Sequence, residues 1–424
     1  MAYDLRRIGP EKPVPPFEPA WIRWAVFCVI LAGGIAVGVV SRWPKGESAH
    51  AAWFWTCATV LPILLGSAPF LFYLGVLQAR RSNAQEYNDD RGDYIRQVQR
   101  EGGVPLHLLA SGFVFSAYEH ENTPVSVTEK KLLLQPRSRY PGDGQCVTAR
   151  WIESPNHCWL PGGDGVDIAR HEEIFRLVAD SLVKQISSAI KALPEHLPVL
   201  TELGVDTLLP TSSVESIWAE VWKANQLKAV SLPLVRTDTP ALIEVDKWLD
   251  GGIPYTLDAV RIMGSVRLAT LLSASPVAGT TEAGAVLVFA TDTLSKRKRL
   301  DSKALLYRPE RGDQSDLAQS VRQILFWSRA KEVELEDLWF GGGSDAPLFR
   351  TLMEQLDAQG IALAKARELK GHHDIDLRIG SAGFVAPWLA IALASVHANI
   401  SAHKQLVSVA DDEALTLAIV VPRT

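Results

Sequence analysis

Two long stretches near the N-terminus carry no charged side chain, and they limit what this part of the chain can form. The first runs from Trp24 to Val40 and the second from Ala51 to Leu77. A helix of about 20 apolar residues crosses the hydrocarbon core of a bilayer. Pro62 and Pro69 lie inside the second stretch, and neighbouring groups in a membrane helix can satisfy the backbone that they free. Both stretches therefore predict membrane-spanning helices.

Tryptophans lie near the ends of both stretches, as the aromatic belts of membrane proteins require. They are Trp21, Trp24, Trp43, Trp53 and Trp55. We predict a transmembrane hairpin over residues 21–77, with spans at about 21–43 and 51–77, after a tail of residues 1–20. A cleaved signal peptide fits less well, because a second span follows and Ser41-Arg42-Trp43 is a weak cleavage site.

Basic residues near the span ends predict the orientation of this hairpin. Four lie in or just after the N-terminal tail, two in the loop between the spans and five after the second span: Arg6, Arg7, Lys12, Arg23; Arg42, Lys45; Arg80, Arg81, Arg91, Arg96, Arg100. Lysine and arginine are enriched on the cytoplasmic side of membrane proteins. Both ends of the hairpin are therefore expected to face the cytoplasm.

The remainder of the chain has the pattern of a globular α/β domain. Residues 78–103 are polar and predict a linker or a membrane-proximal helix, and the domain is expected over residues 104–424. Apolar runs at 106–115, 131–135, 284–292 and 415–421 predict strands buried on both faces. Helical periods cover Glu172–Ala192, Ser213–Ala224, Leu257–Leu272, Asp316–Arg329, Pro347–Gln359 and Phe384–Ala398. This alternation predicts mostly parallel or mixed sheets covered by helices on both sides.

Charge and cysteine usage exclude some classes of function. The chain has 43 basic and 48 acidic residues, so it lacks the basic excess of a nucleic-acid-binding protein. Of the four cysteines, Cys28 and Cys57 lie in the apolar stretches. Cys146 and Cys158 alone make no disulfide framework, which favours a reducing compartment for the main domain.

A glycine-rich turn at 341–346 follows an apolar run and precedes a predicted helix. Gly341, Gly343 and Ala346 satisfy the G-x-G-x-x-A variant of the dinucleotide fingerprint, and Glu368 follows where a ribose-binding acid could lie. Asp345 opposes this interpretation, because it adds a negative charge where a pyrophosphate would bind. A dinucleotide-dependent oxidoreductase that uses Gly341–Ala346 remains one alternative function.

Two groups of histidines are candidate chemical sites. His157 and Cys158 could form a base and a thiol nucleophile, which makes a membrane-anchored acyl-transfer enzyme a second alternative. His372 and His373 are adjacent, and adjacent side chains of a strand point to opposite faces, so they cannot share one metal. A polar turn is favoured for residues 371–376, and neither a metal nor a cofactor is expected.

Three segments resemble the thiolase/ketosynthase fold. TTEAGAVLVFATDTL at 280–294 is similar to the G-E-G-A-G-A strand of ketosynthases. LEDLWFGGGSDAPLFRTLMEQL at 335–356 resembles the H-G-T-G-T segment with its following acid and helix. LRIGSAGFVAPWLAIALASVHANI at 377–400 resembles the I-G-H-x-x-A-A-G segment and its buried helix. The resemblance implies a layered thiolase-like fold over roughly 200–424.

The catalytic positions of that family hold other residues here. In this register Phe340 stands at the first histidine position, Asp345 at the nearby acid and Ser381 at the second histidine. No cysteine follows Cys158 to supply the nucleophile. Condensation needs a thiolate and two imidazoles, so the resemblance implies a scaffold without this chemistry. The glycines then serve a tight strand-to-helix turn.

The order of a short hairpin and a degenerate thiolase-like domain resembles accessory proteins encoded beside phospholipase effectors of bacterial type VI secretion systems. The resemblance implies an inner-membrane adaptor that holds a lipase-like effector in the cytoplasm and delivers it to the spike protein. The resemblance to the thiolase fold also implies a homodimer paired through a central strand, unless a partner covers that strand edge instead. Four aromatic residues are candidates for partner binding, with a place in the core as the alternative: Trp151, Trp159, Trp218 and Trp222.

Overall fold

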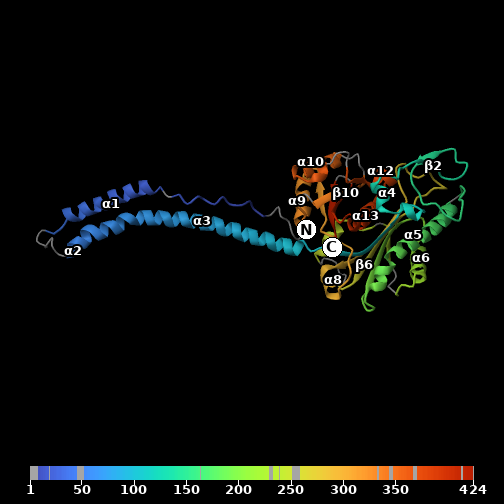
Figure 1. The fold of residues 1–424 in the computed structure, drawn as a ribbon, viewed down its shortest axis with the longest axis horizontal. Helices are drawn as coiled ribbons and strands as arrows, with labels where there is room; N and C mark the ends of the chain where they lie inside the picture. The colour runs from blue at the N-terminus through green and yellow to red at the C-terminus, as the bar shows by residue number, and fades with distance from the viewer. Residues whose placement is uncertain are drawn as a thin grey trace. The chain divides into compact units, whose positions relative to one another are not determined.

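The computed structural model describes residues 8–18, 20–44, 52–162, 164–228, 233–237, 239–250, 258–331, 334–342, 347–365, 370–411 and 414–423 (Figure 1). The chain divides into two compact units, Asp4–Val98 and Gln99–Thr424. The first unit contains the predicted hairpin, and the second contains the predicted α/β domain. Each unit is described by itself below.

The first unit is helical. Its elements are α1 (Trp21–Ser41), α2 (Ala52–Trp55), a π-helical turn (Thr56–Val60) and α3 (Leu61–Gly102), which continues through the polar residues 78–102. No side chain of helix α1 is fully buried, and Ile22 and Val29 are 83% and 71% exposed. In length and composition, α1 and the helical stretch Ala52–Gly102 are both candidates to span a membrane. Lipid would cover these apolar side chains.

Contacts within this unit join its two helices side by side. Trp24 stacks on Tyr73 with ring centroids 4.8 Å apart. A Cβ on Gly66 would lie 2.9 Å from the Cβ of Ala32, so a small residue is needed where the helices approach. The backbone of Lys12 exchanges two hydrogen bonds of 2.9 Å with the Asn88 side chain. The segment before α1 therefore lies beside the part of α3 that follows the second apolar stretch.

The second unit is built on one mixed sheet of eleven strands and a separate two-stranded ribbon. The main strands are β1 (Leu106–Val114), β4 (Val199–Asp206), β5 (Leu234–Arg236), β6 (Val260–Arg267), β7 (Ala283–Thr291), β8 (Ala304–Leu306), β9 (Glu310–Asp313), β10 (Leu335–Gly341), β11 (His372–Asp374), β12 (Lys404–Asp411) and β13 (Ala414–Pro422). β2 (Pro136–Ser138) and β3 (Cys146–Thr148) form the ribbon.

The order of the strands shows the same arrangement twice. The sheet runs β11-β10-β12-β13-β8-β1-β7-β6-β4-β5, with β9 beside β13. When the strands of each half are numbered in chain order without β9 and the ribbon, both halves have the order third, second, fourth, fifth, first. In both halves the second strand is parallel to the third and fourth, and the other pairings are antiparallel. The halves meet where β1 pairs with β8.

Helices cover both halves of the sheet. α5 (Asp164–Ala192) and α6 (Thr211–Ala224) belong to the first half, and α9 (Leu317–Ser328) and α10 (Pro347–Ala358) to the second (Figure 1). The shorter helices are α4 (Pro124–Thr128), α7 (Glu244–Leu249), α8 (Asp292–Lys298), α11 (Ala362–Lys365) and α12 (Ile375–Ile379). The predicted α/β layering is confirmed.

Helix α13 (Ala386–Ser401) lies in the centre of the domain and contacts strands of both halves. Residues Trp388–Ala394 are all fully buried, so the helix is apolar around its whole circumference. By length and composition the segment Gly383–Ser401 also qualifies as a membrane span, but most of its surface is covered by the domain. Its hydrophobicity therefore serves the core.

Three predicted elements were wrong. One is the polar turn at 371–376, where the structure has β11 (His372–Asp374) and the start of α12. The range Leu257–Leu272 is predicted as a helix, but its central residues form strand β6. The side chains of Val260, Ile262 and Val266 pack in one core cluster, and Met263 packs in another. A strand buried on both faces lacks the alternation of apolar and polar residues that distinguishes a strand from a helix. The run at 131–135 forms no strand.

Polar groups on α5 are fully buried and hold the loop before β7. The Arg170 guanidinium donates to both oxygens of Glu282 at 2.8 Å, and Glu282 also accepts from the backbone N–H groups of Ile152 and Ala269. Asp167 accepts from the backbone N–H groups of residues 271–273. Each carboxylate therefore has the donors that a buried charge requires.

The neighbouring His171 is held in its neutral form. Its Nδ1 accepts from the backbone N–H of Leu208 at 3.0 Å, and its Nε2 lies 3.1 Å from the carbonyl oxygen of Ala269. The ring is 1% exposed, and burial lowers the pKa of His171. Protonation at Nδ1 would break the bond to Leu208.

This environment predicts a loss of stability in acid. Because the folded pKa of His171 lies below its unfolded value of about 6.5, stability is complete above that pH and falls below it, by up to about 1.4 kcal/mol per pH unit. Urea unfolding at pH 7.5 and 5.5 measures the effect. In His171→Gln, the free energy of unfolding should differ less between the two pH values than in the wild type. Some difference should remain, because burial also lowers the pKa values of His107 and His372. An unchanged difference would contradict the prediction.

Candidate functional site

The end of β10 is the position where the family resemblance places the first catalytic histidine. Phe340 is buried there, and its ring lies 4.6 Å from that of Phe349 in an edge-to-face arrangement. Gly342 has φ +90°, and a Cβ on it would lie 2.5 Å from the carbonyl oxygen of Ala410. Glycine is therefore required at 342 for backbone reasons. A Cβ on Gly341 would meet only ordinary contacts.

Several residues of the glycine motif lie outside the described part of the chain. They are Gly343, Asp345, Ala346 and Glu368. Of the three fingerprint residues, Gly341 is the one that the structure describes. The turn that follows it at Gly342 has a conformation that the approach of Ala410 already explains.

The second histidine position, Ser381, is held by its backbone. Its N–H donates to the carbonyl of Gly279 at 2.7 Å, and its carbonyl accepts from the N–H of Thr281 at 3.0 Å and from Arg267 at 3.3 Å. A serine hydroxyl in this place cannot act as a base near neutral pH. Neither Phe340 nor Ser381 lines a cavity described below.

The pair proposed for acyl transfer lies on an exposed segment before α5. His157 is directed to a carboxylate, with Nδ1 2.7 Å from Oε2 of Glu173, and its ring packs beside Trp159. Cys158 is an exposed free thiol. The structure thus gives His157 a partner other than the thiol it would activate.

Three of the four candidate partner-binding tryptophans are core residues. Trp218 and Trp222 stack on each other in α6 with centroids 6.3 Å apart, and both are buried. Trp151 is 6% exposed, and Trp159 packs against the same small apolar cluster. Trp151, Trp218 and Trp222 therefore agree with the alternative prediction, which placed these tryptophans in the core.

Trp151 nevertheless lines a cavity of about 220 Å³, here called the Trp151 cavity. The Arg137 guanidinium lies 5.1 Å from its ring, and Arg150 pairs with Glu121 at 3.0 Å. Tyr118 and Leu133 also line it, and each is more than half exposed. A larger cavity of about 660 Å³ lies between the C-terminal parts of α5 and α13.

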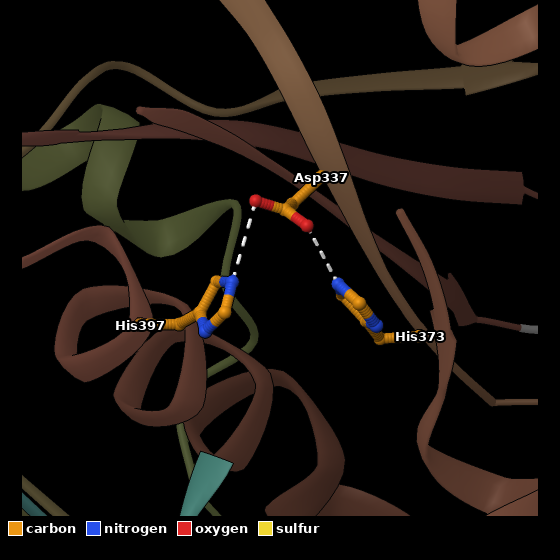
Figure 2. A group of neighbouring side chains, drawn as sticks. All are labelled: Asp337, His373 and His397. Atoms are coloured by element: carbon orange, nitrogen blue, oxygen red, sulfur yellow. Dashed lines mark hydrogen bonds and ion pairs between the residues drawn. The ribbon is translucent and has the colours of Figure 1, made fainter. Parts of the chain in front are cut away.

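A cluster of one carboxylate and two imidazoles lies at the opposite end of α13 from Ser381. Figure 2 shows Asp337 of β10 between His373 of β11 and His397 of α13. The Nε2 atoms of His373 and His397 lie 2.7 Å and 3.4 Å from Asp337 oxygens. The three side chains are 8–15% exposed. A third donor, Nε2 of Gln405, lies 3.1 Å from Asp337 Oδ2.

These hydrogen bonds set the charge state of the cluster. Burial by itself would raise the pKa of Asp337, but the hydrogen bonds from His373, His397 and Gln405 outweigh it and hold this pKa far below its usual range. Trp339 donates from Nε1 to Oε1 of Gln405 at 2.9 Å, which fixes the amide. The carboxylate therefore stays ionised.

Sequence reasoning did not identify this cluster. The expectation that His372 and His373 point apart is confirmed, since His372 Nε2 lies 2.8 Å from the carbonyl oxygen of Leu363 while His373 contacts Asp337. Asp337, His373 and His397 come together only because β10 pairs with β11 and α13 packs on β10. No spacing in the sequence indicates that pairing.

Comparison with solved structures identifies the architecture. The ketosynthase from module 1 of the bacillaene synthase of Bacillus amyloliquefaciens FZB42 matches with a TM-score of 0.50 and 12% identity, over 76% of this chain and 74% of that chain. The chain has a ketosynthase-like fold. The ketosynthase from module 6 of the bacillaene synthase of Bacillus subtilis 168 matches with the same TM-score at 10% identity, over 76% of this chain and 71% of that one.

The ketosynthase-like fold is the extent of this likeness, because identity at this level carries no activity. No protein-family model matches the chain, and no curated protein matches it. The evidence for function therefore comes from the residues that the ketosynthase-like fold positions, above all Phe340 and Ser381.

Proposed function

We propose that this chain is a membrane-anchored binding protein whose ketosynthase-like fold has lost condensing chemistry. The observation that carries the proposal is Phe340, a buried ring at the end of β10 where the resemblance places a catalytic imidazole. Ser381, at the second such position, offers a hydroxyl and no base. Without a thiolate and two imidazoles, neither the acyl intermediate nor the attacking carbanion is stabilised.

A fold that keeps its architecture without its chemistry offers surfaces for recognition. We propose that the partner is a phospholipase-like effector, held in the cytoplasm at the bacterial inner membrane and loaded onto a type VI secretion spike. The layout of an apolar hairpin followed by the domain supports this function. So does the contact between the Lys12 and Asn88 segments, because it favours placement of both hairpin ends on one side of the membrane.

The rim of the Trp151 cavity supplies the surface that we assign to the partner. Tyr118 and Leu133 are 54% and 55% exposed there, beside the Arg137 guanidinium. Exposed aromatic and aliphatic side chains next to an arginine are the composition typical of energetically dominant interface residues. A partner would bury apolar surface that the isolated domain leaves in water.

The test is capture of the partner by the full-length chain from native membranes, with identification by mass spectrometry. A phospholipase-like protein should co-purify in near-stoichiometric amount. Leu133→Asp should reduce its recovery about tenfold, the effect of about 1.4 kcal/mol at an interface. Leu377→Asp is the matched control, because Leu377 is equally exposed at 58% but lies away from the cavity.

Two other results would replace this function. Labelling of Cys158 by an acyl-CoA analogue, with turnover lost in Cys158→Ser, would establish the acyl-transfer alternative. Nicotinamide or flavin bound to the purified protein would establish the dinucleotide alternative. Equal loss of the partner in Leu133→Asp and Leu377→Asp would remove the Trp151 cavity as the contact surface.

A further inference from the structure

We propose that Asp337, His373 and His397 form a binding site for a divalent transition-metal ion, with Zn²⁺ as the ion that fits best. One ligand atom from each residue lies within 4.8 Å of the other two. The three come from β10, β11 and α13, so the site joins a parallel strand pair to the central helix (Figure 2). The proposal does not depend on the function proposed above.

The distances suit tetrahedral coordination. Bonds of about 2.0–2.1 Å to imidazole nitrogen and carboxylate oxygen place neighbouring ligand atoms about 3.4 Å apart. The Nε2 atoms of His373 and His397 lie 2.7 Å and 3.4 Å from the nearest oxygens of Asp337. Small side-chain rotations would therefore bring all three ligands to bonding distance. With three protein ligands, a water molecule would take the fourth position.

The charges of the site also favour a cation. No lysine or arginine pairs with Asp337 among the described residues, and its ion-pair partners are the two histidines. A nearby positive charge stabilises a buried carboxylate beyond what hydrogen bonds to neutral donors provide. At this cluster, a proton on one ring or a metal would supply that charge. A metal supplies it while both imidazoles stay neutral, and an imidazole–carboxylate set is one that Zn²⁺ accepts.

A second layer of hydrogen bonds holds the carboxylate in place. Gln405 donates to Asp337 Oδ2 at 3.1 Å, and Trp339 donates to Gln405 at 2.9 Å. The Trp339 ring also packs against His373 with centroids 4.6 Å apart. Such outer contacts orient metal ligands, and their removal typically weakens metal binding 10- to 100-fold.

The experiment uses the full-length protein in detergent after removal of metal with a chelator. Calorimetric titration with Zn²⁺ should give one ion per chain, with affinity that falls on acidification because protons compete for the imidazoles. His373→Gln and Asp337→Asn should weaken binding by at least about 100-fold, and Gln405→Leu by about 10-fold. His372→Gln is the matched control and should bind as the wild type does, since His372 contacts Leu363 instead.

Absence of stoichiometric Zn²⁺ binding to the wild type would overturn the site and leave a hydrogen-bonded cluster. Equal loss of binding in His372→Gln would do the same, because it would indicate a general effect on the fold. If the ligand variants do not fold, the wild type loaded with Co²⁺ decides the matter. Intense visible absorption would support four-coordinate binding, and the spectrum of hydrated Co²⁺ would refute it.

Discussion

Glu282→Ala is expected to lower the free energy of unfolding of the domain by about 3–5 kcal/mol, the usual effect of removing one partner of a buried ion pair. Glu282 is fully buried and accepts two hydrogen bonds from Arg170 and one each from the backbone N–H groups of Ile152 and Ala269. Alanine would leave two backbone N–H groups without an acceptor, and the buried guanidinium would keep only the carbonyl oxygens of Ala269 and Ile152 and no counter-charge. Since domains are stable by only about 5–15 kcal/mol, this change approaches complete unfolding.

Urea unfolding of the full-length protein in detergent, followed by tryptophan fluorescence, measures this effect. Glu220→Ala is the matched control, because Glu220 also pairs with an arginine, Arg176, but lies on the surface with its side chain 56% exposed. An exposed pair contributes little. The prediction fails if the two variants have the same unfolding midpoint.

Removal of residues 1–98 is expected to move essentially all of the protein from the membrane fraction to the soluble fraction. The apolar side chains of α1 and of the first part of α3 would otherwise require lipid, since each long apolar helix transfers about 20 residues into hydrocarbon. The shortened chain keeps Gln99, whose side chain donates to the carbonyl of Phe326 at 3.0 Å. It also keeps the packing of Gly102 against Trp327.

Ultracentrifugation of lysates, with an immunoblot of both fractions, gives the readout. The full-length chain should resist alkaline extraction, as integral membrane proteins do. Release of the full-length chain by alkali, or sedimentation of the shortened chain with membranes, would show that the hairpin is not the anchor. Circular dichroism of the shortened chain tests whether the domain remains folded.

The sequence was most informative where one pattern has one structural meaning. The uncharged stretches predicted the helices of the first unit, and the long apolar segment at 384–398 predicted α13. The segments around Ala283–Thr291 and Leu335–Gly341 indicated the fold itself, through their resemblance to ketosynthase segments. The second segment ends in a turn at Gly342, whose φ of +90° agrees with the tight turn expected from the glycines.

The sequence was least informative where tertiary contacts decide. Val260–Arg267 forms a strand buried on both faces, and its apolar run fits a helical period equally well. The connection between β5 and β6 contains only the short α7 in its described part, whereas the equivalent connection in the second half contains α13. The cluster of Asp337, His373 and His397 depends on strand pairing that no local pattern encodes.

The pairing of β1 with β8, which joins the two halves of the sheet, has a consequence for the cooperativity of unfolding. Along one edge, residues 106–108 of β1 pair with residues 304–306 of β8, and along its other edge β1 pairs with β7 from Leu106 to Val114. The edge strand of each half therefore hydrogen-bonds to the edge strand of the other half. If one half unfolds, it leaves backbone N–H and C=O groups of the other half unpaired. The two repeats should melt in a single transition, and the amides along this junction should exchange with deuterium among the last in the domain.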